Sequence, residues 1–243
     1  MKEQGTSQMS RATLALREML VQGRFKPGER LREMPLAKQL GISRIPLRLA
    51  LERLAHEGFL EVRATRGFFA QEFSVGDIHD AIELRGCLEG SAARLAAERL
   101  EDRAEAATLR SLHQEMSTLV RKRRFTLEHL GQYVDLNARF HSEIARLAGS
   151  RLLRRAMDQV LSLPFASPNA FLQRQFVAPE ASDLFLISVD QHGGIVESIE
   201  CREGARAENL AREHARIARR NLDGALNTLE AVKVVPGLRL IRL

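Results

Sequence analysis

The spacing of apolar residues in the first 71 positions changes several times, and each change marks the edge of an expected element. Leu47, Ala50, Leu51 and Leu54 repeat at i, i+3, i+4 and i+7, which is the buried stripe of an amphipathic helix. Gly41 supplies the permissive backbone of a sharp turn before that helix. We expect three helices and then a hairpin of two strands, at residues 10–22, 34–40, 44–57, 59–63 and 68–71.

Basic side chains occupy the positions that the buried stripe leaves free. Ser43 is a favourable N-cap for the third helix, and Arg44 and Arg48 lie one turn apart near its N-terminus. Long basic side chains there can reach guanine edges or phosphates. Arg66 and Gly67 lie at the hairpin tip, where they suit a phosphate or minor-groove contact. A solvated helix face would explain an isolated arginine pair, but this order of elements indicates a winged helix-turn-helix.

From Ser74 onward the pattern changes to long helices without strand alternation or a repeat of fixed period. We expect six of them, at residues 75–100, 103–123, 127–148, 150–163, 184–203 and 205–229, with a proline-containing loop at 164–183. The basic run 121–124 would end the second of these helices and suit its dipole. The expected fold is mainly α, with a winged helix-turn-helix domain at 1–73 and an antiparallel bundle of six or seven helices at 74–231. The tail 232–243 has no assigned role, and we expect the first eight residues to be disordered.

Composition adds a charge asymmetry and excludes some classes. Residues 1–73 hold 13 Lys and Arg against 8 Asp and Glu, whereas the rest holds 24 against 23, so the basic surplus belongs to the expected DNA-binding half. Two cysteines indicate reduced thiols and no disulfide framework. The chain has neither a signal-peptide pattern nor an apolar run long enough for a membrane span. We therefore expect a cytoplasmic protein.

Three of the seven histidines stand at helical positions from which they could converge. His141 follows Asn137 by four residues, so both share one helix face, and His192 and His214 lie in the middle of two later helices. From spacing alone, unrelated surface or core histidines explain the pattern better than a shared site does.

The N-terminal stretch resembles the GntR family of bacterial transcriptional regulators. The matching residues are Pro27, Gly28, Leu31, Leu36, Ala37, Leu40, Gly41, Ser43, Arg44, Pro46, Arg48, Ala50, Leu51, Leu54, Gly58 and Gly67. Ile45 and Leu49 depart from the family, which usually has Thr and Glu there, and Ile45 cannot donate the hydrogen bond of a Thr. The resemblance implies DNA contacts by Ser43, Arg44, Ile45, Arg48, Arg66 and Gly67.

The second half resembles the all-helical ligand-binding domain of the fatty-acid-regulator subgroup of that family. This resemblance implies a Zn²⁺ or Ni²⁺ site at Asn137, His141, His192 and His214, in which Asn137 replaces a usual Asp and lowers metal affinity. A metal-free hydrogen-bonding pocket is the alternative. Arg85 and Glu89 match the subgroup's Arg-x-x-x-Glu pattern; Arg85 would bind a carboxylate effector, or else form an internal salt bridge.

These expectations describe an effector-responsive transcriptional repressor. A homodimer would read a palindromic operator in double-stranded DNA, and a small organic acid would shift its conformational equilibrium. We do not expect an enzyme, because no side chain is evidently placed as a nucleophile or general base. A metal-dependent hydrolase and a sequence-neutral architectural DNA binder are the alternatives.

Overall fold

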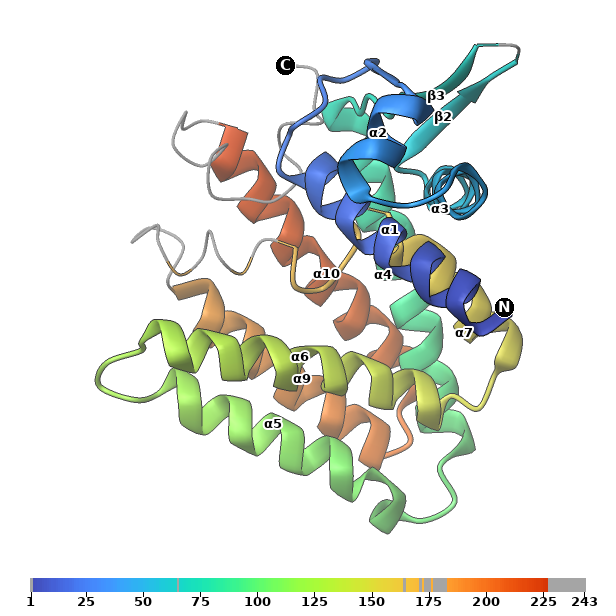
Figure 1. Cartoon of the computed structure of the whole chain (residues 1–243). Coiled ribbons are helices and arrows are strands. Elements are labelled where there is room, and N and C mark those ends of the chain that lie inside the picture. The colour runs from blue at the N-terminus through green and yellow to red at the C-terminus, as the bar shows by residue number, and fades with distance from the viewer. Residues whose placement is uncertain are drawn as a thin grey trace. The chain divides into compact units, whose positions relative to one another are not determined.

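The computed structural model describes residues 2–64, 66–163, 165–170, 172, 176 and 183–226, which form two compact units (Figure 1). The first unit contains residues 2–78 with the short stretch around Ser162, and the second contains the other described residues. The expected tail 232–243 and most of the expected loop 164–183 lie outside the described residues. The expected fold class is confirmed, since the chain is mainly helical with one small sheet.

The first unit is a winged helix-turn-helix. Its elements are α1 (Lys2–Val21), β1 (Arg30–Leu31), α2 (Glu33–Leu40), α3 (Arg44–His56), β2 (Leu60–Arg63) and β3 (Gly67–Ala70). The antiparallel sheet has the order β1-β3-β2, and Phe69 of β3 lies opposite Arg30 of β1 and Glu61 of β2. The two-stranded hairpin expected from sequence is therefore the larger part of a three-stranded sheet.

The core of the first unit joins α1 to α3. Leu16 and Leu20 of α1 and Leu47, Leu51 and Leu54 of α3 are completely buried. Burying one such side chain contributes about 1.5–3 kcal/mol. Because Leu47, Leu51 and Leu54 at i, i+4 and i+7 are buried against α1, the opposite face of α3 is the one exposed to solvent.

The turn between α2 and α3 depends on the backbone of Gly41. This residue has φ +62° and ψ +35°, in the left-handed region, and the next amide, that of Ile42, donates a 3.1 Å hydrogen bond to the Ala37 carbonyl. Ser43 occupies the N-cap position of α3 as expected, with extended backbone angles. Its side chain makes no capping hydrogen bond, however, so its contribution to the cap is conformational.

Two expectations for the first unit are wrong. Residues 2–8 are not disordered but continue α1, and their sequence includes good helix formers such as Lys2, Glu3 and Gln4. Strand β1 was not expected, since a strand of two residues is too short to show any alternation of polarity.

The second unit is an all-helical bundle. Its helices are α4 (Val75–Arg99, which begins within the first unit), α5 (Ala107–Val120), α6 (Leu127–Leu147), α7 (Arg151–Leu161), α9 (Asp183–Glu200) and α10 (Gly204–Leu226), with a 3-10 turn η1 (Arg103–Ala106). Helix α5 packs against α6 and α9, and α9 packs against α10. None of the helices among the described residues combines the length and apolarity needed to span a membrane.

Aromatic side chains pack α6 against α9, whereas small residues allow α4 to approach α10 closely. Tyr133 of α6 is completely buried, lies edge-on to Phe185 of α9 with ring centroids 5.2 Å apart, and hydrogen-bonds Ser188. A Cβ at Gly86 of α4 would lie only 3.0 Å from the Cβ of Ala215 on α10. Glycine at this position therefore allows α4 and α10 to approach closely.

The helix expected at 103–123 is interrupted at its start and shorter at its end. Asp102 and Glu105 form a capping box around η1, and α5 begins only at Ala107. Because α5 ends at Val120 with Arg121 as its C-cap, the basic run 121–124 begins at the cap and not within the last turn, so the expected end at residue 123 is wrong, while the run still lies at the C-terminal end of the helix. Arg121 pairs with Asp190 of α9 at 2.7 Å.

Candidate functional site

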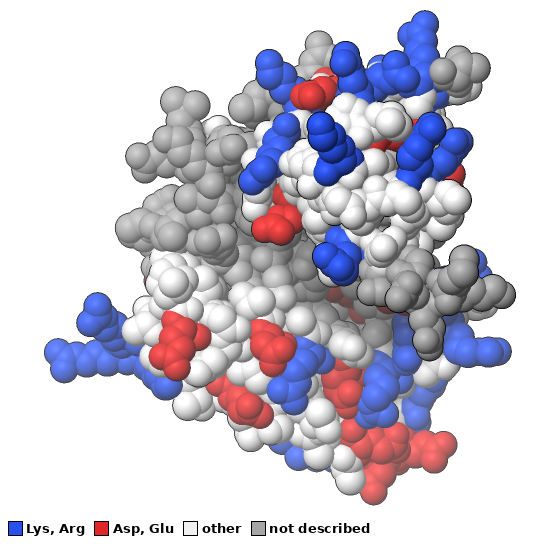
Figure 2. All heavy atoms as spheres, viewed as in Figure 1, with Lys and Arg blue, Asp and Glu red and all other residues white. Residues whose placement is uncertain are grey.

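The outer face of α3 carries the side chains expected to contact DNA. Arg44, Ile45 and Arg48 are exposed, whereas the stripe beneath them is buried. Arg48 makes an exposed 3.3 Å ion pair with Glu52, and Arg44 has no ion pair within the described part of the chain. In Figure 2 the surface of the first unit shows several Lys and Arg side chains around a neutral region. The outer face of α3 can therefore approach a polyanion and still offer the uncharged side chain of Ile45 beside Arg44 and Arg48.

The hairpin between β2 and β3 adds further cationic groups to the first unit. Arg66 is exposed at the tip, and Gly67 has φ +91°, which a residue with a side chain rarely adopts. The Arg30 guanidinium lies 3.8 Å from the point where a Cβ of Gly67 would be. Sequence reasoning missed Arg30, because only the pairing of β1 with β3 brings it to the hairpin.

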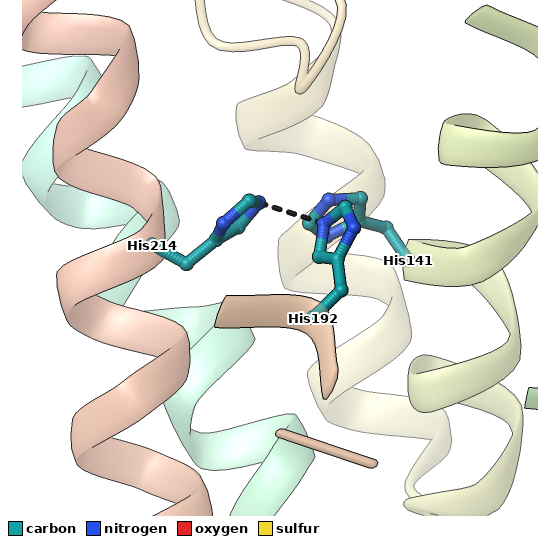
Figure 3. A group of neighbouring side chains, drawn as sticks. All are labelled: His141, His192 and His214. Atoms are coloured by element: carbon teal, nitrogen blue, oxygen red, sulfur yellow. Dashed lines mark hydrogen bonds between the residues drawn. The ribbon is translucent and has the colours of Figure 1, made fainter. Parts of the chain in front are cut away.

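Three buried histidines meet inside the second unit. His141 comes from α6, His192 from α9 and His214 from α10, and Figure 3 shows their rings turned toward one another. One ring nitrogen from each lies within 4.8 Å of the other two, and the Nε2 atoms of His192 and His214 are 3.0 Å apart. The structure thus brings together the three histidines that the spacing singled out.

Amphipathic packing accounts for the position of these rings. His141 belongs to the buried stripe of α6 together with Tyr133, Asn137 and Phe140. His192 lies among buried residues of α9, and its ring centroid is 4.3 Å from that of Phe140. Each imidazole therefore occupies a core position, where burial and neighbouring rings restrict its rotamers.

A buried ion pair from α4 adjoins the histidines. Glu89 Oε1 lies 3.3 Å from His141 Nδ1, and Glu89 Oε2 lies 3.9 Å from Arg85 Nε. Arg85 also donates a 3.0 Å hydrogen bond from Nη2 to the Ala215 carbonyl of α10. The internal salt bridge considered for Arg85 is thus present, and Glu89 has a role at the site that spacing alone did not assign.

Burial and charge set the protonation of the cluster. Burial, together with the neighbouring histidines, lowers the pKa of His192 well below its ordinary value of 6.5 and that of His214 to about 3. Burial would raise the pKa of Glu89, but His141 and Arg85 outweigh this and lower it to about 2. His192 and His214 are therefore neutral near pH 7, with lone pairs available to a metal, and Glu89 is a carboxylate.

Several buried polar atoms of the cluster have no hydrogen-bond partner within the described residues. They are Arg85 Nε and Nη1, both carboxylate oxygens of Glu89, His141 Nε2 and His192 Nδ1. Buried polar groups are nearly always satisfied, so six such atoms in one cluster indicate a missing ligand or water. Nitrogens bound 2.0–2.1 Å from one tetrahedral ion lie roughly 3.3 Å apart. The 3.0 Å between His192 Nε2 and His214 Nε2 is close to this, and the nitrogen of His141 lies within 4.8 Å of both. The three histidines therefore fit a metal ion.

Asn137 lies beside the cluster but has other partners. Its Nδ2 donates a 2.8 Å hydrogen bond to Asn169 Oδ1, and Asn169 in turn donates to the Val134 carbonyl at 3.0 Å. Asn137, Arg85 and His214 line a shared cavity of about 20 Å³, which has room for a water-sized group. This bonding holds the amide nitrogen of Asn137 and leaves its carbonyl oxygen as the possible ligand atom.

A larger cavity of about 620 Å³ reaches the cluster through His141. Its polar lining includes Arg139, Ser142, Arg154 and Asn169. This volume suits a small organic molecule. The charged lining has Arg139, Arg146 and Arg154 against Glu143 and Asp158, so the cations exceed the carboxylates by one. Ser167, Pro168 and Asn169 line the cavity, so the described part of the expected proline-containing loop forms one of its walls.

The remaining histidines have separate structural roles. His79 pairs with Asp223 at 3.0 Å, and His129 forms a capping box with Thr126 at the start of α6. His113 hydrogen-bonds the backbone of Val189, and burial lowers its pKa. His56 is exposed in the last turn of α3. None of them has a ligand atom in the three-histidine cluster.

Two known protein families match this chain, one in each of its two units. Residues 8–70 match the bacterial regulatory proteins of the gntR family, and residues 80–217, more than half of the chain, match the FCD domain.

Individual relatives are similar regulators. The Nta operon transcriptional regulator of Aminobacter aminovorans is 39% identical over 144 residues, which are 58% of this chain and 64% of that protein, so the match spans less than two thirds of that relative. A probable D-xylose utilization operon transcriptional repressor of Paenarthrobacter nicotinovorans is 29% identical over 218 residues, covering 86% of this chain and 88% of the relative. The solved structure of McbR/YncC of E. coli has a TM-score of 0.58 at 22% identity and covers 89% of this chain and 95% of that one, which supports the fold.

Proposed function

Because this chain belongs to the gntR family of bacterial regulatory proteins and carries an FCD domain, we propose that it is a transcriptional repressor controlled by a small organic acid. Its relatives are transcriptional regulators and not enzymes. The observation that carries the proposal is the buried cluster of His141, His192 and His214 beside Arg85, with its unsatisfied polar atoms and adjoining cavity. The chain would act in the cytoplasm, where its DNA lies.

For DNA binding, we propose a homodimer on a palindromic operator. Each α3 would enter a major groove, with Arg44 and Arg48 on base edges or phosphates, and Arg66 and Gly67 would reach the backbone or minor groove. A twofold dimer and a palindrome share one symmetry, so two half-sites about one helical turn apart would be read together. Ser43 would fix the start of the recognition helix, and Ile45 would face the bases.

For the metal, the proposed ligands are His141, His192, His214 and the carbonyl oxygen of Asn137. Three imidazoles suit Zn²⁺ or Ni²⁺, and the neutral amide makes affinity lower than a carboxylate would. When bound, the ion supplies a Lewis-acidic centre that holds a carboxylate. Glu89 Oε1 lies 3.3 Å from His141 Nδ1, so its charge would orient this imidazole and leave Nε2, which has no hydrogen-bond partner among the described residues, for the ion.

For the effector, we propose a small carboxylate that enters the cavity of about 620 Å³. Arg85 Nε and Nη1 are buried and have no hydrogen-bond partner among the described residues, and Arg85 lines the small cavity that it shares with His214, so these two donors would be available to a carboxylate that reaches the cluster. An effector that binds one conformation more tightly shifts the equilibrium toward it, and release of the operator would follow.

Operator binding is tested by removing Arg44 and Arg48 together. The variant Arg44→Ala/Arg48→Ala is expected to lose at least about 100-fold in operator affinity, because each good base contact contributes about 1–3 kcal/mol. The control Arg123→Ala/Arg124→Ala removes the same charge from exposed positions of the second unit and should bind normally. Equal binding by both variants, or equal affinity for operator and random DNA, would reject the proposed recognition surface.

The metal site is tested by elemental analysis of protein purified without added metal or chelator. The wild type is expected to contain about one Zn²⁺ or Ni²⁺ per chain, and His192→Ala to lose it. His79→Ala is the control, since His79 pairs with Asp223 outside the cluster. Metal-free wild-type protein that also fails to bind added Zn²⁺ would reject the site.

A further inference from the structure

The outer face of α3 carries an apolar ridge beside its basic one. Ile45 and Leu49 are four residues apart and therefore adjacent on the helix, and they are 75% and 47% exposed. Arg44 and Arg48 form the parallel ridge one position earlier. A single exposed aliphatic side chain is ordinary, but two neighbours in the first half of a recognition helix lie where base edges are read.

The chemistry of the major groove limits what such a ridge can recognise. Among the four base pairs, the apolar group presented there is the C5 methyl of thymine, whereas the other features are hydrogen-bond donors and acceptors. Ile45 and Leu49 have no polar side-chain atom, so they cannot pair with a donor or an acceptor. The favourable contact open to these two side chains is therefore apolar packing against the C5 methyl group of thymine.

A protein partner is a poorer explanation of the ridge. A stable protein interface buries about 800 Å² on each side, far more than two side chains provide. The neighbouring Arg44 and Arg48 would also have to be desolvated, whereas phosphates and guanines stabilise them in place.

We propose that Ile45, supported by Leu49, reads thymine through its C5 methyl group, so that each operator half-site contains a thymine chosen by this contact. The inference rests on the proposed function and extends it, because it assigns base specificity to the apolar side chains. Arg44 and Arg48 then supply guanine or phosphate contacts on either side of that thymine.

The test separates the methyl group from the rest of the base. An operator is selected from random DNA with the full-length protein, and each thymine of the half-site is replaced in turn by deoxyuridine, which keeps base pairing. At one or two positions the wild type should lose about three- to fivefold in affinity per methyl removed. Ile45→Ala should bind the unmodified operator more weakly and show no further loss with deoxyuridine, and Leu49→Ala should show a reduced loss.

Leu14→Ala is the matched control, since Leu14 is an exposed leucine on α1 of the same unit. It should keep the wild-type loss at every position. The inference is overturned if the wild type binds all deoxyuridine operators equally well, or if Ile45→Ala keeps the full loss. If selection enriches no sequence at all, the proposed function as a specific regulator fails, and the inference fails with it.

Discussion

Glu89 is the side chain through which the charge of the histidine site is set. It is 4% exposed, lies 3.3 Å from His141 Nδ1 and 3.9 Å from Arg85, and remains a carboxylate at neutral pH. A carboxylate that accepts from one imidazole nitrogen orients the ring and makes the other nitrogen a stronger ligand. Glu89 thus contributes to the proposed metal site without being a proposed ligand.

Glu89→Gln should therefore weaken Zn²⁺ binding about 10- to 100-fold, because the amide keeps the shape of the side chain but removes its charge. Competition with a chelating dye measures this affinity. Glu83→Gln on the same helix is the control, since its carboxylate faces the exposed arginines Arg212 and Arg216. If Glu89→Gln bound Zn²⁺ as tightly as the wild type does, the charge of Glu89 would have no part in metal binding.

At the scale of residues, helical spacing together with the family resemblance selected the three histidines but not their surroundings. Helical periodicity placed Asn137 and His141 on one face, and the structure keeps both buried. The contact between Glu89 and His141 could not be derived in this way, because it joins α4 to α6, and the spacing within one helix does not say which helices pack together. Arg30 was missed for a similar reason, as strand pairing determines its position.

Among the elements, the turn before α3 depends on one backbone conformation. Gly41 has φ +62°, and no atom lies within 4 Å of the position that a Cβ would take. Gly41→Ala should therefore destabilise the first unit by about 1–2 kcal/mol through the left-handed backbone alone. Urea unfolding followed by circular dichroism measures the change.

Gly131→Ala provides the contrast to that substitution. Gly131 lies within α6, has ordinary helical φ and likewise has no atom near a Cβ. Alanine there should stabilise the protein by about 0.5–1 kcal/mol, since glycine is a poor helix former. A similar effect of both substitutions would mean that the φ of Gly41 does not limit the turn.

The link between α1 and the end of α3 should make the first unit sensitive to acid. Burial would raise the pKa of Glu57, but hydrogen bonds from Arg17 and Arg53 outweigh it and lower that pKa below its ordinary value of 4.5. A carboxylate whose pKa is lower in the folded than in the unfolded state stabilises the fold at pH values above its unfolded-state pKa. This stabilisation is lost as the pH falls through its folded-state pKa.

Glu57→Gln, which cannot titrate, should be less stable than the wild type by about 1 kcal/mol at pH 7. The difference should shrink as the pH falls from about 5 toward 3. Thermal unfolding across this range measures it, with Glu52→Gln as an exposed control on α3. A difference that stays constant with pH would contradict the ionic role of Glu57.

Element boundaries were predictable where the sequence carries a breaker or a cap. Gly149 follows α6 and Gly41 follows α2, and both helices end within one residue of expectation. The division between η1 and α5 was not predictable, because Asp102 and Glu105 cap a turn within an otherwise continuous helical pattern. The length of α1 was underestimated, since its polar start has no apolar periodicity to reveal it.

For the whole molecule, the uneven charge predicts how binding responds to salt. The excess of 13 Lys and Arg over 8 Asp and Glu lies in residues 1–73. If the dimer neutralises about 6–10 phosphates, operator affinity should fall about 10³- to 10⁵-fold between 50 and 200 mM salt. Zn²⁺ binding at the buried histidines should change far less, because salt screens buried charges weakly. Fluorescence anisotropy measures operator affinity, and dye competition measures Zn²⁺ affinity. If both affinities fell equally with salt, the exposed basic surface would not be what makes DNA binding depend on salt.

Tyr133 gives the second unit a built-in optical signal. The chain has one tyrosine and no tryptophan, and this tyrosine is completely buried between α6 and α9, one turn before Asn137. The tyrosine fluorescence of the protein therefore originates in the helical bundle, because the winged helix-turn-helix has neither tyrosine nor tryptophan. Unfolding of the bundle and occupation of the neighbouring cluster can be followed without a label, and a tryptophan introduced into the first unit would report on that unit at a separate emission wavelength.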